Sequence, residues 1–183
     1  MRDDLILLQG IRNRDKRAIV EVFDKYATAI YRYAYRLCGN ETEADDVVGD
    51  VFAQLLDHIK AGNGPRDNLR AYIYQMAYHR IVDKSRREKH LAELSDNIHS
   101  ESTEWPHAKQ EHNDLHAILI KTIQTHLTAD QQHVILLRFF EGLSVHDTAE
   151  VLGKDHNNIK VIQSRGIAKL RQVLDIELLR EIL

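Results

Sequence analysis

Apolar side chains recur along nearly the whole chain at the spacing of an amphipathic helix. One stripe covers residues 47–59, where apolar positions fall three to four residues apart, as on one face of a helix with about 3.6 residues per turn. Another stripe covers residues 19–37 and includes Val20 and Phe23, and a short helix over residues 4–10 precedes it. No segment of the sequence alternates apolar and polar residues as a half-buried strand does. The pattern therefore predicts an all-α protein.

Signals for starting and ending helices separate these stripes. Gly39 is typical of a helix C-terminus because a left-handed terminal residue favours glycine. Thr42 with Asp45 predicts a capping box at the start of the next helix. Segments 128–131 and 144–147 fit the same capping pattern, so two further helices are expected to begin there.

The helical pattern fades between residues 91 and 112. Residues 91–130 carry two basic and seven acidic side chains, so the segment is predicted to be a polar, acidic linker. The chain is thereby predicted to form two small helical domains, residues 1–90 and 113–183. Domains of this size bury only about 60–65% of the surface of the unfolded chain, which favours function on a larger partner.

Composition narrows the class of protein further. A single cysteine among 183 residues excludes an internal disulfide framework and any zinc site built on paired thiolates. It also favours a reducing, cytoplasmic compartment. No apolar run approaches the roughly 18 residues of a membrane span, and the N-terminus lacks the pattern of a signal peptide, so membrane insertion is not expected.

Charge is distributed unevenly along the chain. The formal net charge of −3, taken alone, argues against nucleic acid as a partner. Residues 61–90 nevertheless carry seven basic and three acidic side chains, and residues 154–171 carry five basic and one acidic. A DNA-binding protein needs a local basic face rather than a basic total. These two segments are therefore candidate nucleic-acid contacts.

The most specific motif begins at Val145. If Val145 is the first position of a helix-turn-helix, Ala149 takes the small-residue position and Gly153 takes the turn. Such a motif places its second helix in the major groove, where side chains contact base edges and phosphates. The side chains predicted to face DNA are His156, Asn157, Asn158, Lys160, Val161, Ser164, Arg165 and Lys169.

A second candidate is the basic helix predicted over residues 68–89. It interleaves tyrosines with cations, which suits stacking on unstacked bases at about 1–3 kcal/mol per base. Tyr72 lies on the apolar stripe of this helix, so burial and base contact are both open for it, whereas Arg70 and Tyr74 are expected to be exposed. The candidate residues are Arg70, Tyr72, Tyr74, Arg80, Lys84, Arg86 and Arg87.

Together these segments resemble the extracytoplasmic-function (ECF) sigma factors, small two-domain members of the sigma-70 family of bacterial RNA polymerase. Residues 41–56 resemble the helix that docks on the clamp helices of the polymerase β′ subunit. Residues 72–88 resemble the helix that recognises the −10 promoter element. Residues 127–171 resemble the domain that binds the −35 element, and this is the most specific of the three matches.

The resemblance implies a function in promoter selection rather than an enzymatic one. A protein of this family binds core RNA polymerase through the β′ clamp helices and the β flap, recognises both promoter elements and promotes DNA opening. An anti-sigma factor is a further partner that the resemblance allows, and neither a cofactor nor a metal ion is implied.

The resemblance also implies roles for individual residues. Core binding is expected at four positions of the predicted acidic helix: Asp45, Asp46, Asp50 and Gln54. The loop over residues 61–68 is expected to capture a flipped base of the −10 element, together with the basic helix that follows it. The polar groups of this loop are Asn63, Arg66, Asp67 and Asn68.

Two other functions compete with this interpretation. A helix-turn-helix regulator that is not a sigma subunit would carry the same motif, but it has no need for the acidic helix or the basic one. A metalloenzyme would use some of the 11 histidines, and His112 and His116 lie one helical turn apart. However, the sequence contains no HExxH motif and no third ligand at a clear spacing. The sequence therefore favours a sigma factor.

Overall fold

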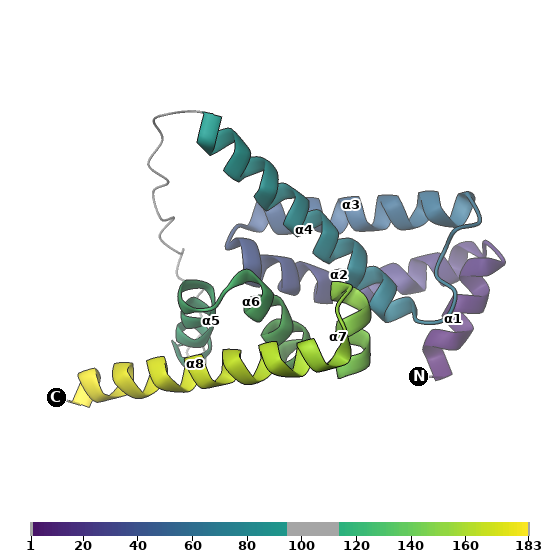
Figure 1. Ribbon diagram of the computed structural model, residues 1–183. Helices are drawn as coiled ribbons and strands as arrows, with labels where there is room; N and C mark the ends of the chain where they lie inside the picture. Colours follow the sequence, from purple (N-terminus) through teal and green to yellow (C-terminus); the bar gives the residue numbers. More distant parts are fainter. Residues whose placement is uncertain (1, 95–113, 183) are drawn as a thin grey trace. The chain divides into compact units, whose positions relative to one another are not determined.

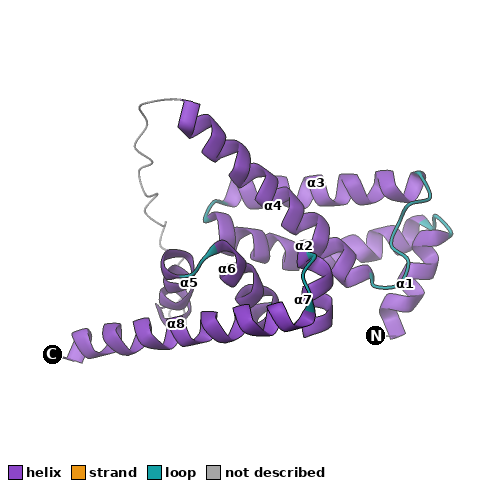
Figure 2. Ribbon diagram, viewed as in Figure 1, coloured by secondary structure: helices purple, strands orange, loops and turns teal. Residues whose placement is uncertain are grey.

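The computed structural model describes residues 2–94 and 114–182, and every regular element within them is helical (Figure 1, Figure 2). The predicted all-α class is therefore confirmed. The chain divides into two compact units, Met1–Thr103 and Glu104–Leu183. The linker predicted over residues 91–112 lies largely outside the described residues. In the part that is described, no helix combines the length and the apolarity needed to span a bilayer.

The described part of the first unit consists of α1 (Arg2–Arg12), α2 (Lys16–Cys38), α3 (Glu41–Lys60) and α4 (Leu69–Leu94). Helix α2 packs against α1 and α3, and α4 packs against α3 and α2. Each of the four helices places large side chains in a shared core. Fully buried members of this core are Ile11, Ile30, Tyr33, Leu55, Leu69, Ile73 and Tyr74.

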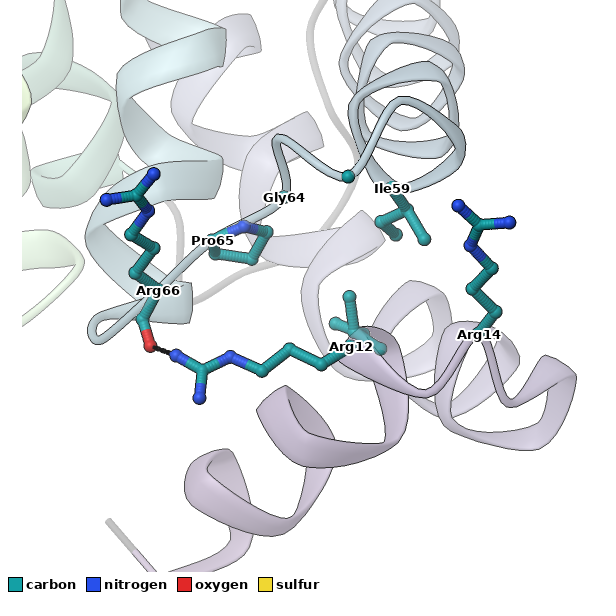
Figure 3. A pocket seen from close by; sticks show the side chains of 8 residues that line it. Arg12, Arg14, Ile59, Gly64, Pro65 and Arg66 are labelled. Atoms are coloured by element: carbon teal, nitrogen blue, oxygen red, sulfur yellow. Dashed lines mark hydrogen bonds between the residues drawn. The ribbon is translucent and has the colours of Figure 1, made fainter.

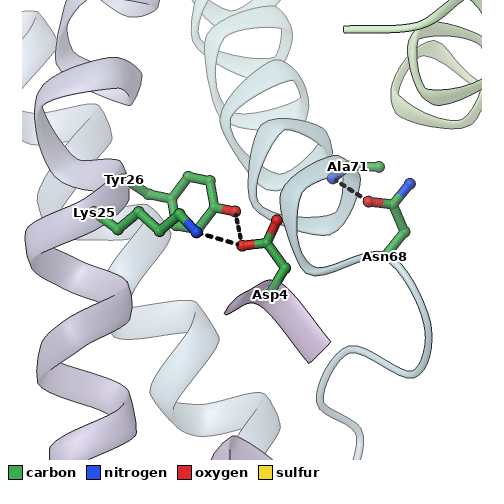
Figure 4. A network of polar contacts seen from close by, with 5 residues as sticks. All are labelled: Asp4, Lys25, Tyr26, Asn68 and Ala71. Carbon is green, nitrogen blue, oxygen red and sulfur yellow. Dashed lines mark hydrogen bonds and ion pairs between the residues drawn. The ribbon is translucent and has the colours of Figure 1, made fainter. Parts of the chain in front are cut away.

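The buried face of α2 differs from the predicted apolar stripe. The stripe places Val20 and Phe23 in the core, but these side chains are 59% and 46% exposed. Tyr26 and Tyr33 are buried in their place, and the Tyr26 hydroxyl donates to the Asp4 carboxylate at 2.7 Å (Figure 4). A tyrosine is readily buried once its hydroxyl has a partner. The apolar stripe, defined mainly by aliphatic residues, therefore predicted the wrong buried face for α2.

Side-chain and glycine caps set the helix ends around residue 40. Gly39 ends α2 in the left-handed conformation, with a φ of 70°, as expected from the sequence. The capping box predicted at Thr42 is wrong. The residue that caps α3 is Asn40, whose side chain accepts a hydrogen bond from the backbone N–H of Glu43 at 3.1 Å. Asparagine is among the strongest N-cap residues, so α3 starts at Glu41, directly after Asn40.

The described part of the second unit consists of α5 (Asp114–His126), α6 (Ala129–Ile135), the π-helical segment η1 (Leu136–Phe140), α7 (Val145–Leu152) and α8 (His156–Ile182). Helix α8 packs against α5, α6 and α7. The capping boxes predicted at Thr128 and Ser144 are both present. The fully buried core includes Ile123, Leu136, Leu137, Leu143 and Ile159.

Candidate nucleic-acid interface

The turn between α7 and α8 has the geometry of a helix-turn-helix. Gly153 ends α7 with a φ of 61°, a left-handed conformation that other L-residues rarely adopt. Ala149 and Ile159 are buried where α7 packs on α8. Asp155 caps α8, because its Oδ1 accepts from the backbone N–H of Asn158 at 2.9 Å. The structure thus confirms the predicted positions of the turn.

The side of α8 that was predicted to face DNA is exposed. Val161 is 45% exposed although it is apolar, whereas Ile159 is fully buried. A row of amides, a hydroxyl group and cations on one helix side suits a groove lined by phosphates. We call this row the α8 face. Its members are His156, Asn157, Asn158, Lys160, Val161, Ser164, Arg165 and Lys169.

Arg138 braces the hairpin from η1, and sequence reasoning missed it. Its Nε donates to Gln163 Oε1 at 3.0 Å, and its guanidinium also donates to the Leu143 carbonyl. Gln163 lies on α8 and Leu143 precedes α7, so one side chain holds both helices of the motif. The Gln163 partner lies 25 positions away in the sequence, which explains why no local pattern pointed to Arg138.

A salt bridge ties the turn to α6. Lys154 Nζ lies 3.0 Å from Asp130 Oδ2, close to the buried imidazole of His133. Burial lowers the pKa of His133 to about 4, with a smaller opposing effect from the Asp130 carboxylate. At neutral pH the second unit therefore holds an uncharged imidazole in its core.

In the first unit, the turn between α1 and α2 supports the loop over residues 61–68. Arg14 donates to the Lys60 carbonyl at 2.9 Å, and the Arg12 guanidinium donates to the Arg66 carbonyl. Figure 3 shows Arg12 reaching the backbone of Arg66 while the Arg66 side chain points away from it. A cleft of about 450 Å³ lies between the turn and the loop. These bonds hold both ends of the loop, and sequence reasoning missed them because their partners lie 46 and 54 positions apart.

Tyr72 and Asn68 also support this loop. The Tyr72 hydroxyl donates to the Asn63 carbonyl at 3.2 Å and lies 2.5 Å from His58 Nδ1. Asn68 Oδ1 accepts from the backbone N–H of Ala71 at 3.1 Å at the start of α4 (Figure 4). Both side chains are half-buried, so each combines a supporting contact with some exposed surface. The other predicted polar residues of the loop are exposed: Asn63, Arg66 and Asp67.

Tyr74 corrects the predicted set of DNA contacts. It was expected to be exposed, but its side chain is only 1% exposed and packs edge-on against Tyr33, with ring centroids 5.6 Å apart. The guanidinium of Arg70, which is half-buried rather than exposed, lies 5.9 Å from the Tyr74 ring centroid. Helix α4 packs on α2 as well as on α3, so its buried face is wider than the predicted stripe. Tyr74 is a core residue.

Two predicted DNA-binding cations of α4 pair with acids of α3. Arg80 forms a salt bridge with Asp50, and Lys84 Nζ lies 3.2 Å from Glu43 Oε2. Partly exposed pairs of this kind contribute only about 0–1 kcal/mol, so little opposes their exchange for a phosphate or another protein. Two further predicted cations, nearer the C-terminus of α4, are exposed: Arg86 and Arg87.

The predicted core-binding residues form an acidic face on α3. Asp46, Asp50 and Gln54 are spaced four residues apart, so they lie on the same side of the helix. Asp45 is adjacent to this row, and all four side chains are exposed. The structure therefore gathers these four residues on one solvent-facing surface.

Exposed apolar side chains lie on α2 and α3. Phe23 of α2 packs against Phe52 of α3, with ring centroids 4.8 Å apart. Val20 is 59% exposed, Phe23 46% and Leu56 37%. We call these three residues the α2–α3 apolar patch. Clustered exposed apolar surface is typical of protein–protein contacts, and sequence reasoning missed this patch because it assigned the residues to the core.

Comparison with known proteins now decides between the remaining functions. Models of sigma-70 region 2 and sigma-70 region 4 match residues 22–91 and 125–172, one in each unit. The chain is 26% identical over 171 residues to the ECF RNA polymerase sigma factor BldN of Streptomyces coelicolor, covering 92% of this chain and 64% of BldN. The chain belongs to the ECF group of the sigma-70 family. This sigma factor is also 25% identical over 168 residues to the ECF sigma factor SigX of Bacillus subtilis, covering 87% and 84% of the two chains.

Two solved structures of protein complexes share the fold. The sigma factor RpoE in complex with the anti-sigma factor NepR, from Bartonella quintana, matches with a TM-score of 0.73 and 23% identity, over 85% of this chain and 96% of that one. CnrH in complex with the cytosolic domain of CnrY matches with a TM-score of 0.66 and 23% identity, over 95% and 98%. At this level of identity, the likeness supports the fold alone.

The family decides between the alternatives left open by the sequence. A helix-turn-helix regulator outside the polymerase would match only the second of the two family models, whereas both match here. The chain is an RNA polymerase sigma factor, and its partners are core RNA polymerase and promoter DNA. The family consists of transcription initiation factors rather than enzymes.

Proposed function

We propose that this sigma factor divides promoter recognition between its two units. The second unit binds the −35 element through the α8 face, and the first unit captures unstacked bases of the −10 element at the loop over residues 61–68. The acidic face of α3 docks on the β′ clamp helices of core polymerase, while the second unit contacts the β flap. The observation that carries the proposal is the exposed α8 face on a hairpin braced by Arg138.

Reading of the −35 duplex follows from the chemistry of the α8 face. Asn157 and Asn158 lie in the first turn of α8 and can pair with adenine, whereas Lys160 and Arg165 can reach the acceptors of guanine. Each good bidentate contact contributes about 1–3 kcal/mol of discrimination between bases. Lys169 lies further along the helix and suits a phosphate contact, which positions the protein without reading sequence.

Capture of a −10 base is supported by the loop over residues 61–68. Its exposed polar side chains stand on a backbone that Arg12, Arg14 and Tyr72 already hold. Less conformational entropy is lost when a binding loop is ordered before its ligand arrives. That saving helps to offset the few kcal/mol needed to flip a base out of the duplex. Arg86 and Arg87 then contact the phosphates of the opened strand.

Docking on core polymerase combines the acidic face with the α2–α3 apolar patch. Complementary charge sets orientation and association rate, and apolar surface removed from water supplies part of the affinity. Asp50 pairs with Arg80 in the free protein. Docking of Asp50 on the polymerase therefore releases Arg80 toward DNA.

The same surfaces suggest how the protein is located and controlled. Because this sigma factor acts with core polymerase on promoter DNA, we expect it in the cytoplasm. An anti-sigma factor that covers the α2–α3 apolar patch or the α8 face would prevent docking. The structural relative RpoE was solved in complex with an anti-sigma factor.

Reconstitution with core RNA polymerase tests the proposed docking surface. The full chain should co-elute with core polymerase in a stoichiometric complex and direct promoter-dependent transcription. The double variant Asp45→Ala/Asp46→Ala should weaken core binding by about fivefold, as expected for two exposed charges at an interface. Glu21→Ala is the matched control, because Glu21 is an exposed acid on α2 rather than on the acidic face of α3. Equal core binding by the two variants would show that the acidic face does not dock there.

A further inference from the structure

Two histidines meet at the turn of the helix-turn-helix, and the proposed function uses only one of them. His146 is the second residue of α7 and His156 is the first residue of α8. His146 Nδ1 lies 3.0 Å from His156 Nε2, and the rings are nearly perpendicular, at 80°. Both side chains are exposed, so the pair is accessible to solutes.

Neighbouring contacts fix the helix ends that carry the two rings. The start of α7 is closed by the capping box of Ser144 and Asp147, and Asp155 caps the start of α8. The glycine turn and the Arg138 brace hold the two helices together. The two imidazole nitrogens are therefore brought together by the fold rather than by mobile side chains alone.

The 3.0 Å separation of His146 Nδ1 and His156 Nε2 is that of a hydrogen bond between the two rings, and it also equals the spacing of a chelate. Imidazole nitrogens bind metal ions at about 2.0–2.1 Å, so two of them at adjacent positions, at a right angle, lie roughly 3.0 Å apart. Tetrahedral ligands at the same bond length lie about 3.4 Å apart. The observed 3.0 Å fits adjacent positions of square-planar or octahedral coordination, which nitrogen-bound Ni²⁺ and Cu²⁺ adopt.

We propose that His146 and His156 form a two-ligand binding site for a divalent transition-metal ion of the nickel type. His146 binds through Nδ1 and His156 through Nε2, and the ion links α7 to α8 across the turn. In the described part of the chain, no group of three or more metal-binding side chains occurs. Water fills the remaining coordination positions, so the ion is exchangeable. This site rests on the fold alone and does not depend on promoter recognition.

Binding has a consequence for the α8 face. His156 is the first member of that face, and its Nε2 is occupied when metal is bound. Only its Nδ1–H then remains to donate a hydrogen bond. Metal binding therefore changes the hydrogen-bonding capacity of His156, at the end of the recognition helix that reaches base edges first. The rest of the helix is unchanged.

Calorimetric titration of the full chain, without a histidine tag, with NiCl₂ at neutral pH tests the site. Wild type should bind one equivalent, and the ion should raise the melting temperature because it binds the native state. Loss of a side chain that only hydrogen-bonds to a metal ligand already weakens metal affinity by about 10–100-fold. Because His146 and His156 are proposed as ligands themselves, His146→Ala and His156→Ala should each weaken binding by about tenfold or more. His116→Ala should bind as wild type does, since this exposed histidine lies on α5.

Three results would overturn the site: no saturable binding by wild type, unchanged affinity in His146→Ala, or an equal loss in His116→Ala. Loss of binding in His116→Ala together with unchanged affinity in His146→Ala would assign the ion to a site that includes His116. Circular dichroism shows whether each variant is folded, and His146→Gln gives a second variant if alanine at this position disturbs α7. Retained binding by a folded His146→Gln protein contradicts the proposal equally.

Discussion

The uncharged imidazole of His133 makes the second unit sensitive to acid. Burial lowers the pKa of His133 from 6.5 to about 4. Below pH 6.5 the unfolded chain takes up a proton at this ring, whereas the native state does so only as the pH falls through about 4. The stability that this difference supplies is complete above pH 6.5 and is lost as the pH falls toward 4. The full loss is about 3 kcal/mol.

Urea titration at a series of pH values, followed by the backbone NMR signals of α6 and α8, measures this loss. The free energy of unfolding of the second unit should fall between pH 6.5 and 4 in wild type and much less in His133→Leu. His116→Ala, which removes an exposed histidine, should keep the wild-type slope. A wild-type slope in His133→Leu would show that other groups cause the acid sensitivity.

Single residues were predictable where their partners are close in sequence. The Ser144–Asp147 box and the Asp155 cap follow from a spacing of three residues, and both are present. The burial of Tyr74 against Tyr33 and the contacts of Arg138 depend on other helices. No local pattern contains that information, because the same side chains on an isolated helix would face water.

The conformation of the loop over residues 61–68 depends on hydrogen bonds from other elements. Arg14 donates to the Lys60 carbonyl from the turn between α1 and α2. Hydrogen bonds with a charged partner contribute about 1.5–3 kcal/mol, with less expected at an exposed site. Arg14→Ala should therefore slow opening of the −10 element by about five- to tenfold and leave binding of −35 duplex unchanged.

Fluorescence of 2-aminopurine placed in the −10 element, in the complex with core polymerase, reports this opening. Arg17→Ala is the matched control, because Arg17 is an exposed arginine on α2 that does not line the cleft between the turn and the loop. An opening rate in Arg14→Ala equal to that of Arg17→Ala would show that the loop needs no support from the turn. A parallel loss of −35 binding would point to general unfolding instead.

The sequence predicts which segments are helices, but it does not predict which face of each helix is buried. The helical repeat gives the class, and the position of Gly39 gives the end of α2. The face of α2 that is buried depends on which helices surround it, and Tyr26 enters the core only because α1 supplies Asp4. The same effect left Val20 and Phe23 in solvent, where they now belong to a candidate polymerase contact.

At the scale of the whole molecule, the net charge of −3 is the sum of acidic and basic surfaces with different proposed functions. The acidic face of α3 and the cations of α4 are partly paired with each other, through Asp50 with Arg80 and Glu43 with Lys84. The basic side chains proposed to contact DNA in the second unit lie on α8. A total charge therefore says little about DNA binding, whereas the distribution along the chain predicts both candidate DNA-binding segments.

Promoter reading by α8 is tested most directly by transcription with core polymerase on a library in which the −35 element is randomised. Lys160→Ala and Arg165→Ala should each relax the base preference at one or two −35 positions, by about 1–3 kcal/mol per lost contact, and leave the −10 preference unchanged. Lys121→Ala, an exposed lysine on α5, should keep the wild-type preference. Unchanged −35 preferences in both α8 variants would contradict the assignment of α8 as the reading helix.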